Sequence, residues 1–296
     1  MNILITGRNG QVGHALSQTP SLTNLGTCVF LDRSQLDLAD FDALRNTVKN
    51  LRPDLIINAA AYTAVDQAES EETLAHRING EAPGVLAEAA KAVGAALIHY
   101  STDYVFDGSK QGAWTETDQP SPLSAYGRSK LVGEQAIAAV GLPHLILRTS
   151  WVYGLYGKNF LLTMQRLAQT RDELSIVADQ FGAPTWSQTI ADATAATVRQ
   201  LNEPAQLAEH SGIYHLCAGG QTSWHGFAQK IFEHPAMTQR PRLKAITTAE
   251  YPTPAARPKN SVMNTEKFRS LFGELPQWDE ALRQCQQHLL SDAAQR

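Results

Sequence analysis

The sequence predicts an α/β fold, a doubly wound parallel sheet with a smaller C-terminal mixed α/β lobe. Short, wholly apolar runs alternate with amphipathic stretches through the first half of the chain. Continuous apolar strands are typical of a parallel sheet covered by helices on both faces, and right-handed crossovers then give a doubly wound topology. After about Val152, glycines and Pro184 interrupt the chain and strand-like runs become sparser. This change indicates the second lobe.

The first half contains five expected strands, which are Asn2–Thr6, Thr27–Leu31, Asp54–Asn58, Ala95–Ser101 and His144–Thr149. Helical periodicity between them is clearest in Phe41–Leu51, Glu81–Val93 and Ala125–Val140. Later helical patterns are Asn159–Gln169, Trp186–Leu201 and Ser223–Phe232, and later strand-like runs are Leu174–Ala178 and Ile213–Cys217. We therefore expect a first domain over residues 1–152 and a second lobe over residues 153–296, partly interleaved with the first.

Composition and charge exclude several classes of protein. The net charge is −4 with acids and bases mixed along the chain, which argues against a nucleic-acid binder. No run approaches the roughly 18 apolar residues of a membrane span, and the N-terminus reads as a strand and not a signal peptide. Cys28, Cys217 and Cys285 are far apart, as expected of small buried residues in a reducing compartment. We expect a cytoplasmic protein that binds neither nucleic acid nor membranes.

A glycine-rich turn joins the first expected strand to a helical pattern. Gly7, Gly10 and Gly13 follow one another at three-residue intervals in TGRNGQVG. The first glycine permits a tight turn, the second lets the backbone approach a pyrophosphate, and the third lets helix and strand pack closely. The helix N-terminus then favours the anion. At the first strand–helix junction of an alternating chain, this turn indicates an NAD(P)-binding Rossmann domain more than a merely structural turn.

Two further strand ends suit a dinucleotide. The second strand ends at Asp32 and Arg33. An acid here typically binds the adenosine ribose, whereas an arginine can accommodate the 2′-phosphate of NADPH. With both present, NADPH and NADH stay open, and so does a surface ion pair without a ligand. After the third strand, the small residues of NAAAYT allow a cofactor to lie against the backbone.

Tyr126 and Lys130 form a Tyr-x-x-x-Lys pair on one face of an expected helix. A free tyrosine titrates near pH 10, and a neighbouring cation lowers its pKa. Tyr126 could then protonate a ketone oxygen while a cofactor reduces the carbon. Thr102, about two dozen residues earlier at a strand end, could hydrogen-bond the same carbonyl. The glycine turn, the strand-end hydroxyl and the Tyr–Lys pair, in this order, predict a dehydrogenase.

Two neighbouring residues keep alternative interpretations. Asp103 either orients a substrate hydroxyl or caps the turn after the strand. Asn79 either supports a helix kink with a proton path or serves as a helix N-cap.

The chain resembles the extended short-chain dehydrogenases that act on nucleotide sugars. The segments NILITGRNGQVG, HYSTDYVFDG and SPLSAYGRSKLVGE are similar across many of these enzymes, whereas LRTSWVYG, DQFGAPT and YPTPAARP resemble a narrower branch that reduces a dTDP-linked keto sugar. The resemblance implies reduction of the C4 ketone of dTDP-4-dehydro-L-rhamnose to dTDP-L-rhamnose by NADPH or NADH, with Tyr126 as proton donor. The second lobe would then bind the substrate.

The same resemblance implies roles for individual residues. Cofactor positions, besides Gly7 and Arg33 above, would be Gly10, Gln11, Val12, Asp32, Asp37, Leu38, Ala61, Tyr62, Thr63, Tyr100, Tyr126 and Lys130. Thr102, Tyr126 and Lys130 match the catalytic triad, and Lys130 would also bind the nicotinamide ribose. Substrate positions would be Thr102, Asp103, Trp151, Asn159 and Arg257. Alternatives are a core aromatic for Trp151, a helix N-cap for Asn159 and a surface charge for Arg257.

One segment departs from some similar enzymes, in which a glutamate after GAPT helps to bind a divalent metal between subunits. Here Gln188 stands near that place, and an amide is a poorer ligand for a hard cation than a carboxylate. We expect no metal, and no zinc at His210 and His215. The sequence leaves the oligomeric state open between a monomer and a homodimer.

Two other functions stay open. An epimerase of the same superfamily would retain its cofactor, and a non-catalytic regulatory subunit would bind a partner enzyme. The Thr-Asp-Tyr run at Thr102 lacks the glutamate usual in dehydratases, and an intact Thr102, Tyr126 and Lys130 set argues against a pure binding subunit.

Overall fold

A six-stranded parallel sheet forms the centre of the molecule. The computed structural model describes residues 1–201, 204–235 and 237–294. The strands are β1 (Asn2–Thr6), β2 (Thr27–Leu31), β3 (Leu55–Asn58), β4 (Ala96–Thr102), β5 (His144–Thr149) and β10 (Gly212–His215). Their order is β10-β5-β4-β3-β1-β2, and every neighbouring pair is parallel. The predicted doubly wound fold is confirmed.

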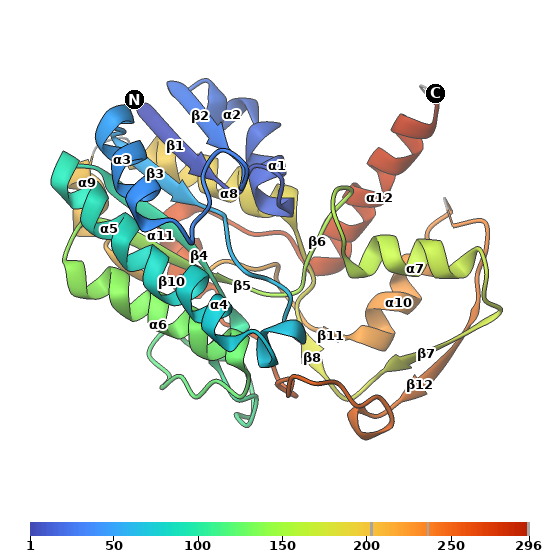
Figure 1. Cartoon of the computed structure of the whole chain (residues 1–296). Coiled ribbons are helices and arrows are strands. Elements are labelled where there is room, and N and C mark those ends of the chain that lie inside the picture. The colour runs from blue at the N-terminus through green and yellow to red at the C-terminus, as the bar shows by residue number, and fades with distance from the viewer. Residues whose placement is uncertain (202–203, 236, 295–296) are drawn as a thin grey trace.

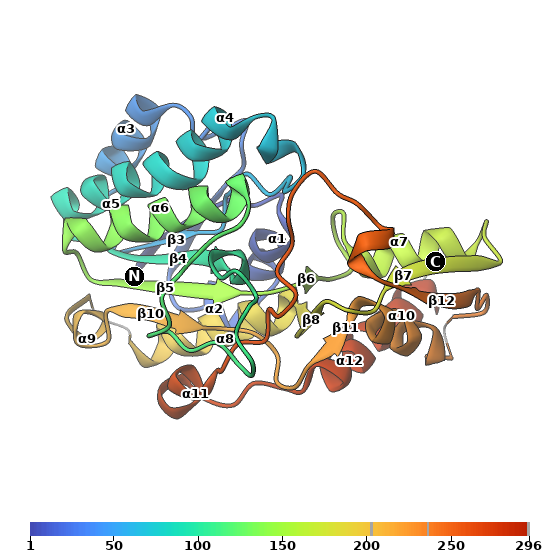
Figure 2. The ribbon, with the colours of Figure 1, turned by 90° about the horizontal axis from the view of Figure 1, so that it is seen from below.

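Helices cover both faces of this sheet (Figure 2). One face carries α3 (Phe41–Leu51), α4 (Glu72–His76), the π-helical turn η2 (Arg77–Glu81), α5 (Ala82–Val93) and α6 (Ala125–Val140). The other carries α1 (Gln11–Ser17), α2 (Pro20–Thr23), α8 (Ser187–Gln200) and α11 (Glu266–Phe272). Each layer has its own apolar core, the first around Leu44 and Leu86 and the second around Leu16 and Ile190. The remaining short elements near the sheet are η1 (Gln67–Glu69), η3 (Asp103–Val105) and α9 (Pro204–Glu209).

Local signals set the ends of the helices. The Asp40 carboxylate accepts a hydrogen bond from Ala43 N at 2.9 Å and so begins α3. The Ser124 hydroxyl accepts from Gly127 N at 3.1 Å at the start of α6, and Gly141, with φ 70°, ends that helix. These caps lie where the sequence changes from periodic to turn-forming residues. The predicted helices 41–51 and 125–140 therefore agree with the structure residue for residue.

A smaller lobe lies beside the C-terminal ends of the strands (Figure 1). It contains the pairs β6 (Val152–Tyr153) with β9 (Thr185–Trp186), β7 (Glu173–Val177) with β12 (Arg242–Ile246), and β8 (Phe181–Gly182) with β11 (Thr222–Ser223). Its helices are α7 (Phe160–Ala168), α10 (Trp224–Glu233) and α12 (Trp278–Ala294), with the short η4 (Thr248–Glu250). Tyr153, Leu161, Phe227 and Cys285 belong to its core. The mixed α/β character expected of this region is confirmed.

The two halves of the chain are interleaved. We assigned the strand-like residues 213–217 to the second lobe, but β10 pairs with β5 at the edge of the main sheet. The helices α8 and α11, also late in the chain, cover that sheet. The boundary at residue 152 stays a prediction. Within the described residues, none of the helices is long and apolar enough to cross a membrane, and all three cysteines are free.

Candidate active site

The glycine turn lies where the strand order reverses. The strand β1 lies between β2 and β3. The chain passes from β1 to β2 on one side and then crosses to β3 on the other side, so the order reverses at β1. Gly7 has φ 76°, and a Cβ there would lie 2.6 Å from Ala60 N, after β3. A Cβ on Gly13 would lie 2.1 Å from Gly7 O. Two of the three glycines are therefore required by close backbone approach at the switch point, where ligands bind in open α/β sheets.

Helix α1 starts directly after this turn, with Gly10 as its N-cap. The N–H groups of its first turn have no carbonyl partner within the helix, which suits them to a phosphate group. Gln11 donates through Nε2 to Val152 O at 3.4 Å, while its Oε1 is buried and has no partner among the described residues. Val12 packs against the core beneath the sheet. The turn thus suits a dinucleotide by its backbone N–H groups, and a Cβ at Gly7 or Gly13 would collide with neighbouring backbone.

Asp32 follows β2 at the edge of the same crevice. Its carboxylate accepts from the hydroxyl and N–H of Ser34 at 2.6 and 2.8 Å, and from Asn9 Nδ2 at 3.0 Å. These hydrogen bonds lower the pKa of Asp32, and the one from the Ser34 hydroxyl has the largest effect. Arg33 is exposed and pairs with Asp37 at 3.5 Å. The alternative of an ion pair between Asp32 and Arg33 is wrong, because Arg33 uses another partner.

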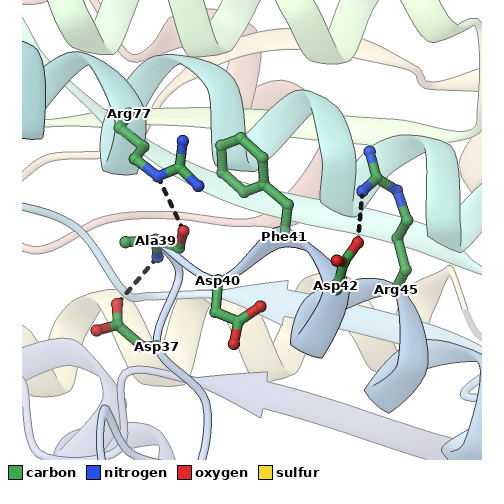
Figure 3. A pocket seen from close by; sticks show the side chains of 7 residues that line it. All are labelled: Asp37, Ala39, Asp40, Phe41, Asp42, Arg45 and Arg77. Atoms are coloured by element: carbon green, nitrogen blue, oxygen red, sulfur yellow. Dashed lines mark hydrogen bonds and ion pairs between the residues drawn. The ribbon is translucent and has the colours of Figure 1, made fainter.

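Beyond this edge lies a hollow of about 510 Å³. Figure 3 shows the side chains that line it, which are Asp37, Ala39, Asp40, Phe41, Asp42, Arg45 and Arg77. The Arg77 guanidinium lies 4.1 Å from the centre of the Phe41 ring and donates to Ala39 O at 2.9 Å. Leu38, next to Asp37, is buried in the core. Of the predicted site residues, Asp37 alone lines this hollow, so it is separate from the catalytic group.

The segment after β3 is held by Asn79. Tyr62 N donates to Asn79 Oδ1 at 2.8 Å, and Asn79 Nδ2 donates to Tyr62 O at 2.9 Å. The Tyr62 hydroxyl donates to Glu71 at 2.8 Å, Ala61 is half-buried and Thr63 is exposed. Asn79 lies inside the π-helical turn η2 and is not a helix N-cap. Of its two interpretations, the helix distortion is the one that the structure shows.

Thr102 and Tyr126 come together at the C-terminal edge of the sheet. Thr102 ends β4, and Tyr126 lies in the first turn of α6. The Thr102 hydroxyl donates to Asp103 Oδ1 at 3.0 Å. Burial raises the pKa of Tyr126, and hydrogen bonding with Thr102 opposes that rise. The nearby Asp103 and Tyr104 raise it further, so the isolated phenol holds its proton firmly at neutral pH.

Lys130 is buried beneath α6 and contacts β4. Its Nζ donates to Tyr100 O at 2.7 Å and lies 3.1 Å from His99 Nε2. Burial lowers the pKa of Lys130 to about 8, against the opposing charge of Glu134. We expected Lys130 to lower the pKa of Tyr126. Burial is the largest influence on the pKa of Tyr126 in this structure, and the effect of Lys130 on it stays a prediction.

Tyr100 contacts Lys130 only through its backbone. Its ring belongs to the core on the opposite face of the sheet, and its hydroxyl lies 2.7 Å from Thr194 Oγ1 of α8. Burial raises the pKa of Tyr100. A predicted role along the cofactor would therefore fall to its carbonyl and not to its ring.

Asp103 is a buried carboxyl with a free oxygen. Its side chain is 2% exposed, and Oδ2 has no hydrogen-bond partner among the described residues. Burial raises the pKa of Asp103 to about 6, although the hydroxyls of Ser261 and Thr102 lower it in part. A buried polar atom without a partner is costly in a protein used for structure alone. The free oxygen therefore favours a ligand contact over a cap.

Arg257 connects the late loop to the catalytic group. Its guanidinium donates to Asp66 Oδ2 at 2.8 Å and to the Tyr104 hydroxyl at 3.2 Å. The Tyr104 ring meets the Tyr126 ring edge to face, with centroids 5.6 Å apart. The alternative of a plain surface charge is wrong, since this side chain is only 23% exposed and paired.

Trp151 and Asn159 lie on the side of the smaller lobe. Trp151 has φ 48°, which is unusual for a large residue, and its ring stacks on Trp224 with centroids 3.6 Å apart. The side chain is half-buried, and Trp224 covers one face of its ring. Asn159 is the N-cap of α7: its Oδ1 accepts from Leu162 N at 3.1 Å and its Nδ2 donates to Gly154 O at 2.9 Å. Of the two interpretations of Asn159, the helix N-cap is the one that its contacts show.

Comparison with known proteins places these features in a family. Residues 1–291 match the family described as RmlD substrate binding domain. A dTDP-4-dehydrorhamnose reductase of Burkholderia thailandensis is 50% identical over 98% of this chain and 100% of its own length. The chain belongs to the dTDP-4-dehydrorhamnose reductase family.

Solved structures of the family agree with the fold. A dTDP-4-dehydrorhamnose reductase from Clostridium acetobutylicum has a TM-score of 0.90 at 37% identity, covering 98% of this chain and 100% of that one. One from Bacillus anthracis, in complex with NADP, has a TM-score of 0.87 at 36% identity, covering 97% and 99%.

Sequence reasoning missed several neighbours of the site in this reductase family member. Tyr104, Asp66 and Ser261 contact predicted residues, but they come from three separate segments. No spacing in the sequence connects these residues. Gln188, which we compared with a metal-binding carboxylate, donates to Thr19 Oγ1 at 3.0 Å and to Asp192 Oδ1 at 2.9 Å.

Proposed function

We propose that this protein reduces the C4 ketone of dTDP-4-dehydro-L-rhamnose to dTDP-L-rhamnose with NADPH, and that Tyr126 donates the proton. The observation that carries the proposal is the hydrogen bonding of Thr102 with Tyr126 at the carboxyl edge of the same sheet that bears the glycine turn. Its relatives over the full chain are named for this reaction, and the Bacillus anthracis structure holds NADP.

The cofactor fits this chain through its backbone and Asp32. The N–H groups in the first turn of α1 would receive the pyrophosphate, and the tight turn that Gly7 and Gly13 permit holds them in place. Gly10, Gln11 and Val12 would lie along it, with Asp32, Arg33, Asp37 and Leu38 at the adenosine end, and Ala61, Tyr62, Thr63 and the Tyr100 carbonyl toward the nicotinamide. When bound, NADPH supplies the hydride for the carbonyl carbon.

The side chains around the ketone divide the remaining work. With the ketone bound, the Thr102 hydroxyl turns its hydrogen from Asp103 Oδ1 to the ketone oxygen, and Tyr126 gives that oxygen its proton. A phenol with a raised pKa is a weak acid, so it transfers its proton only when negative charge develops on the ketone oxygen. Proton transfer from Tyr126 then accompanies or follows hydride transfer. Lys130 binds the ribose hydroxyls and holds the region between α6 and β4. Orientation of these groups supplies much of the acceleration.

The substrate would lie between the strand ends and the smaller lobe. Asp103 Oδ2 can accept from a sugar hydroxyl, and Trp151 offers a flat wall for the apolar side of a deoxysugar. Arg257 suits the diphosphate because its planar fork matches two phosphate oxygens. We give Asn159 a capping role only. We further propose a cytoplasmic location, which suits the free thiols, and leave a homodimer to measurement.

Steady-state assays with the keto sugar test the proposal. Purified protein should oxidise NADPH only when the sugar is present. With NADH in place of NADPH, the rate of oxidation should be lower or zero. Tyr126→Phe should lower kcat by roughly 10²–10⁴-fold while NADPH still binds. Tyr153→Phe is the matched control, since the Tyr153 hydroxyl is buried in the smaller lobe without a partner in the described part of the chain.

Three results would count against the assignment. Near-normal turnover by Tyr126→Phe would remove its role as proton donor. NAD retained through purification, with epimerised sugar as product, would favour an epimerase. Co-purification with a larger enzyme and no NADPH oxidation would favour a regulatory subunit.

A further inference from the structure

The indole of Trp151 is held between two residues of the smaller lobe. The Trp224 ring stacks on it with centroids 3.6 Å apart and planes at 7°. A Cβ on Gly182 would lie 2.6 Å from Trp151 Cε2 and 2.9 Å from both Nε1 and Cζ2 of the same ring. Trp224 and Gly182 therefore both lie against the indole, and we call these two residues the indole clamp.

The distances at Gly182 show which side of the ring it covers. A point in the plane of the ring and outside it would lie nearer to Nε1 or Cζ2 than to Cε2, whereas Cε2 is the nearest atom here. Gly182 therefore lies over a face of the indole. A Trp224 ring stacked on that same face would lie nearer to this point than Trp151 does, yet the nearest atoms all belong to Trp151. Gly182 and Trp224 thus lie on opposite faces of the indole.

Both residues of the indole clamp belong to one short ribbon and its continuation. The strands β8 and β11 pair antiparallel with Gly182 opposite Thr222, and Trp224 follows β11 as the first residue of α10 (Figure 1). The backbone of Trp151 is fixed nearby, because Thr185 N donates to Trp151 O at 3.2 Å. Main-chain hydrogen bonds therefore set the spacing of the two residues around the ring.

Trp151 needs this support because its backbone conformation is unfavourable. Its φ of 48° lies in the left-handed region, which bulky residues rarely adopt. Residues persist there only where the surrounding structure holds them, and they are frequent at ligand sites. The Trp224 ring also packs near Phe160 and Phe227, with centroids 4.8 and 6.4 Å away. The indole clamp is thus anchored in the core of the smaller lobe.

We propose that Trp224 and Gly182 are positioning residues that hold the Trp151 indole in place for the sugar of the substrate. The inference rests on the proposed reductase function, in which Trp151 contacts the deoxysugar. Trp151 stays partly exposed, so the sugar would contact the part of the ring that the indole clamp leaves open. A ring that is already fixed loses no rotamer freedom when a ligand binds. The indole clamp therefore favours sugar binding and leaves the chemical step to Thr102 and Tyr126.

The indole N–H resonance of Trp151, assigned by its loss in Trp151→Phe, tests the clamp apart from any activity. Trp224→Leu removes the stacked ring, so this resonance should move by more than its linewidth. Gly182→Ala should also move it, because the new Cβ would meet the ring. Trp278→Leu is the matched control: Trp278 is a half-buried indole of the same core, and among the described residues its ring contact is with Phe227. The control should leave the Trp151 resonance in place.

Steady-state kinetics give a second test. Trp224→Leu should raise the KM for the keto sugar by about tenfold or more, while kcat changes by less than about threefold and the affinity for NADPH is unchanged. Trp224→Phe keeps an aromatic ring on the indole and should restore most of the lost sugar affinity. Trp278→Leu perturbs the same core and should leave the KM for the sugar unchanged.

Gly182→Ala approaches the indole from its other face and should also raise the KM for the sugar. Its control is Gly219→Ala, whose Cβ would lie 2.6 Å from the side chain of Gln277 and not against Trp151. The control should leave this KM unchanged. If Trp224→Leu does not fold, this pair of glycine variants decides the question.

The outcomes are separable. A Trp151 resonance that stays in place in both Trp224→Leu and Gly182→Ala would overturn the inference, and so would an equal rise of the sugar KM in Trp224→Leu and Trp278→Leu. Either result would leave the reductase function standing. A wild-type protein whose Trp151 resonance responds as expected, but which does not oxidise NADPH with the keto sugar, would overturn the proposed function and leave the indole clamp in place.

Discussion

The rings of Tyr104 and Tyr126 meet edge to face, with centroids 5.6 Å apart and planes at 76°. Tyr126 comes from the first turn of α6, and Tyr104 from the turn directly after β4. The Tyr104 hydroxyl accepts a hydrogen bond from Arg257, whose other nitrogen pairs with Asp66. A late loop therefore reaches the proposed proton donor through one aromatic contact, and this contact can be tested separately from its hydrogen bond.

Tyr104→Phe and Tyr104→Ala should differ sharply. The phenylalanine keeps the edge-to-face contact, so kcat should change by less than about threefold, whereas the alanine removes a contact of about 0.5–1.5 kcal/mol and frees the Tyr126 ring. We expect kcat for the alanine variant to fall by roughly tenfold or more. Stopped-flow measurement of NADPH oxidation checks this. Equal losses in both variants would show that the hydroxyl, and not the ring, is what matters.

The glycine turn predicts a graded loss of cofactor affinity. A Cβ at Gly13 would lie 2.1 Å from Gly7 O, whereas one at Gly10 would lie 3.3 Å from the same oxygen. Gly13→Ala must displace the turn and should weaken NADPH binding by about tenfold or more. Gly10→Ala meets only mild crowding within the protein, so its loss of affinity reports the approach of the pyrophosphate to Gly10. Fluorescence titration with NADPH measures both. Wild-type affinity in Gly13→Ala would contradict this placement of the cofactor.

Local patterns were enough to predict most elements of the sheet. The strands 2–6, 27–31 and 144–149 agree with the structure residue for residue, because each apolar run ends at a turn-forming or polar residue. The pairing of strands that are far apart in the chain has no comparable signal in the sequence. The strand β10 joins β5 across more than sixty intervening residues, as the register of Gly212 with Leu145 shows. Its short sequence reads equally well as part of either lobe.

The candidate site was predictable only where its residues lie close in sequence. Tyr126 and Lys130 share a helix face, and Thr102 ends the neighbouring strand. The contact between Tyr104 and Arg257 spans 153 residues, so spacing could not reveal it. Nor could spacing show that Lys130 turns toward His99 of β4, which depends on how α6 packs over the sheet.

Asp103 should make stability depend on pH. Burial raises its pKa from 3.8 to about 6, so the folded protein binds this proton more tightly than the unfolded chain. The stabilisation is fully present below pH 3.8 and is lost as the pH rises through about 6. A difference of about two pH units is worth about 3 kcal/mol.

Asp103→Asn removes this titration. Relative to the wild type, its free energy of unfolding should rise between pH 4 and pH 7, by up to about 3 kcal/mol. Urea unfolding at four pH values measures the difference, with Asp107→Asn as control because Asp107 is a half-buried neighbour whose pKa is lowered and not raised. A difference that stays constant with pH would mean that Asp103 is not destabilised by burial.

Glu134 and Arg148 form a buried ion pair between α6 and β5. The two side chains are 2% and 1% exposed, and the guanidinium donates to both carboxylate oxygens, at 2.9 and 2.6 Å. Removing one partner leaves the other charge buried, which typically costs about 3–5 kcal/mol. Glu134→Gln should therefore lower the free energy of unfolding by an amount in this range, measured by urea denaturation.

The exposed pair of Arg242 and Glu173 supplies the comparison. Its side chains are 79% and 47% exposed and 3.2 Å apart, so Glu173→Gln should change the free energy of unfolding by less than about 1 kcal/mol. Because Glu134 lies one turn beyond Lys130 and favours its charged form, Glu134→Gln should also lower the Lys130 titration midpoint. A raised midpoint, measured from the ¹³Cε resonance of Lys130, would contradict the charge effect of Glu134 on Lys130.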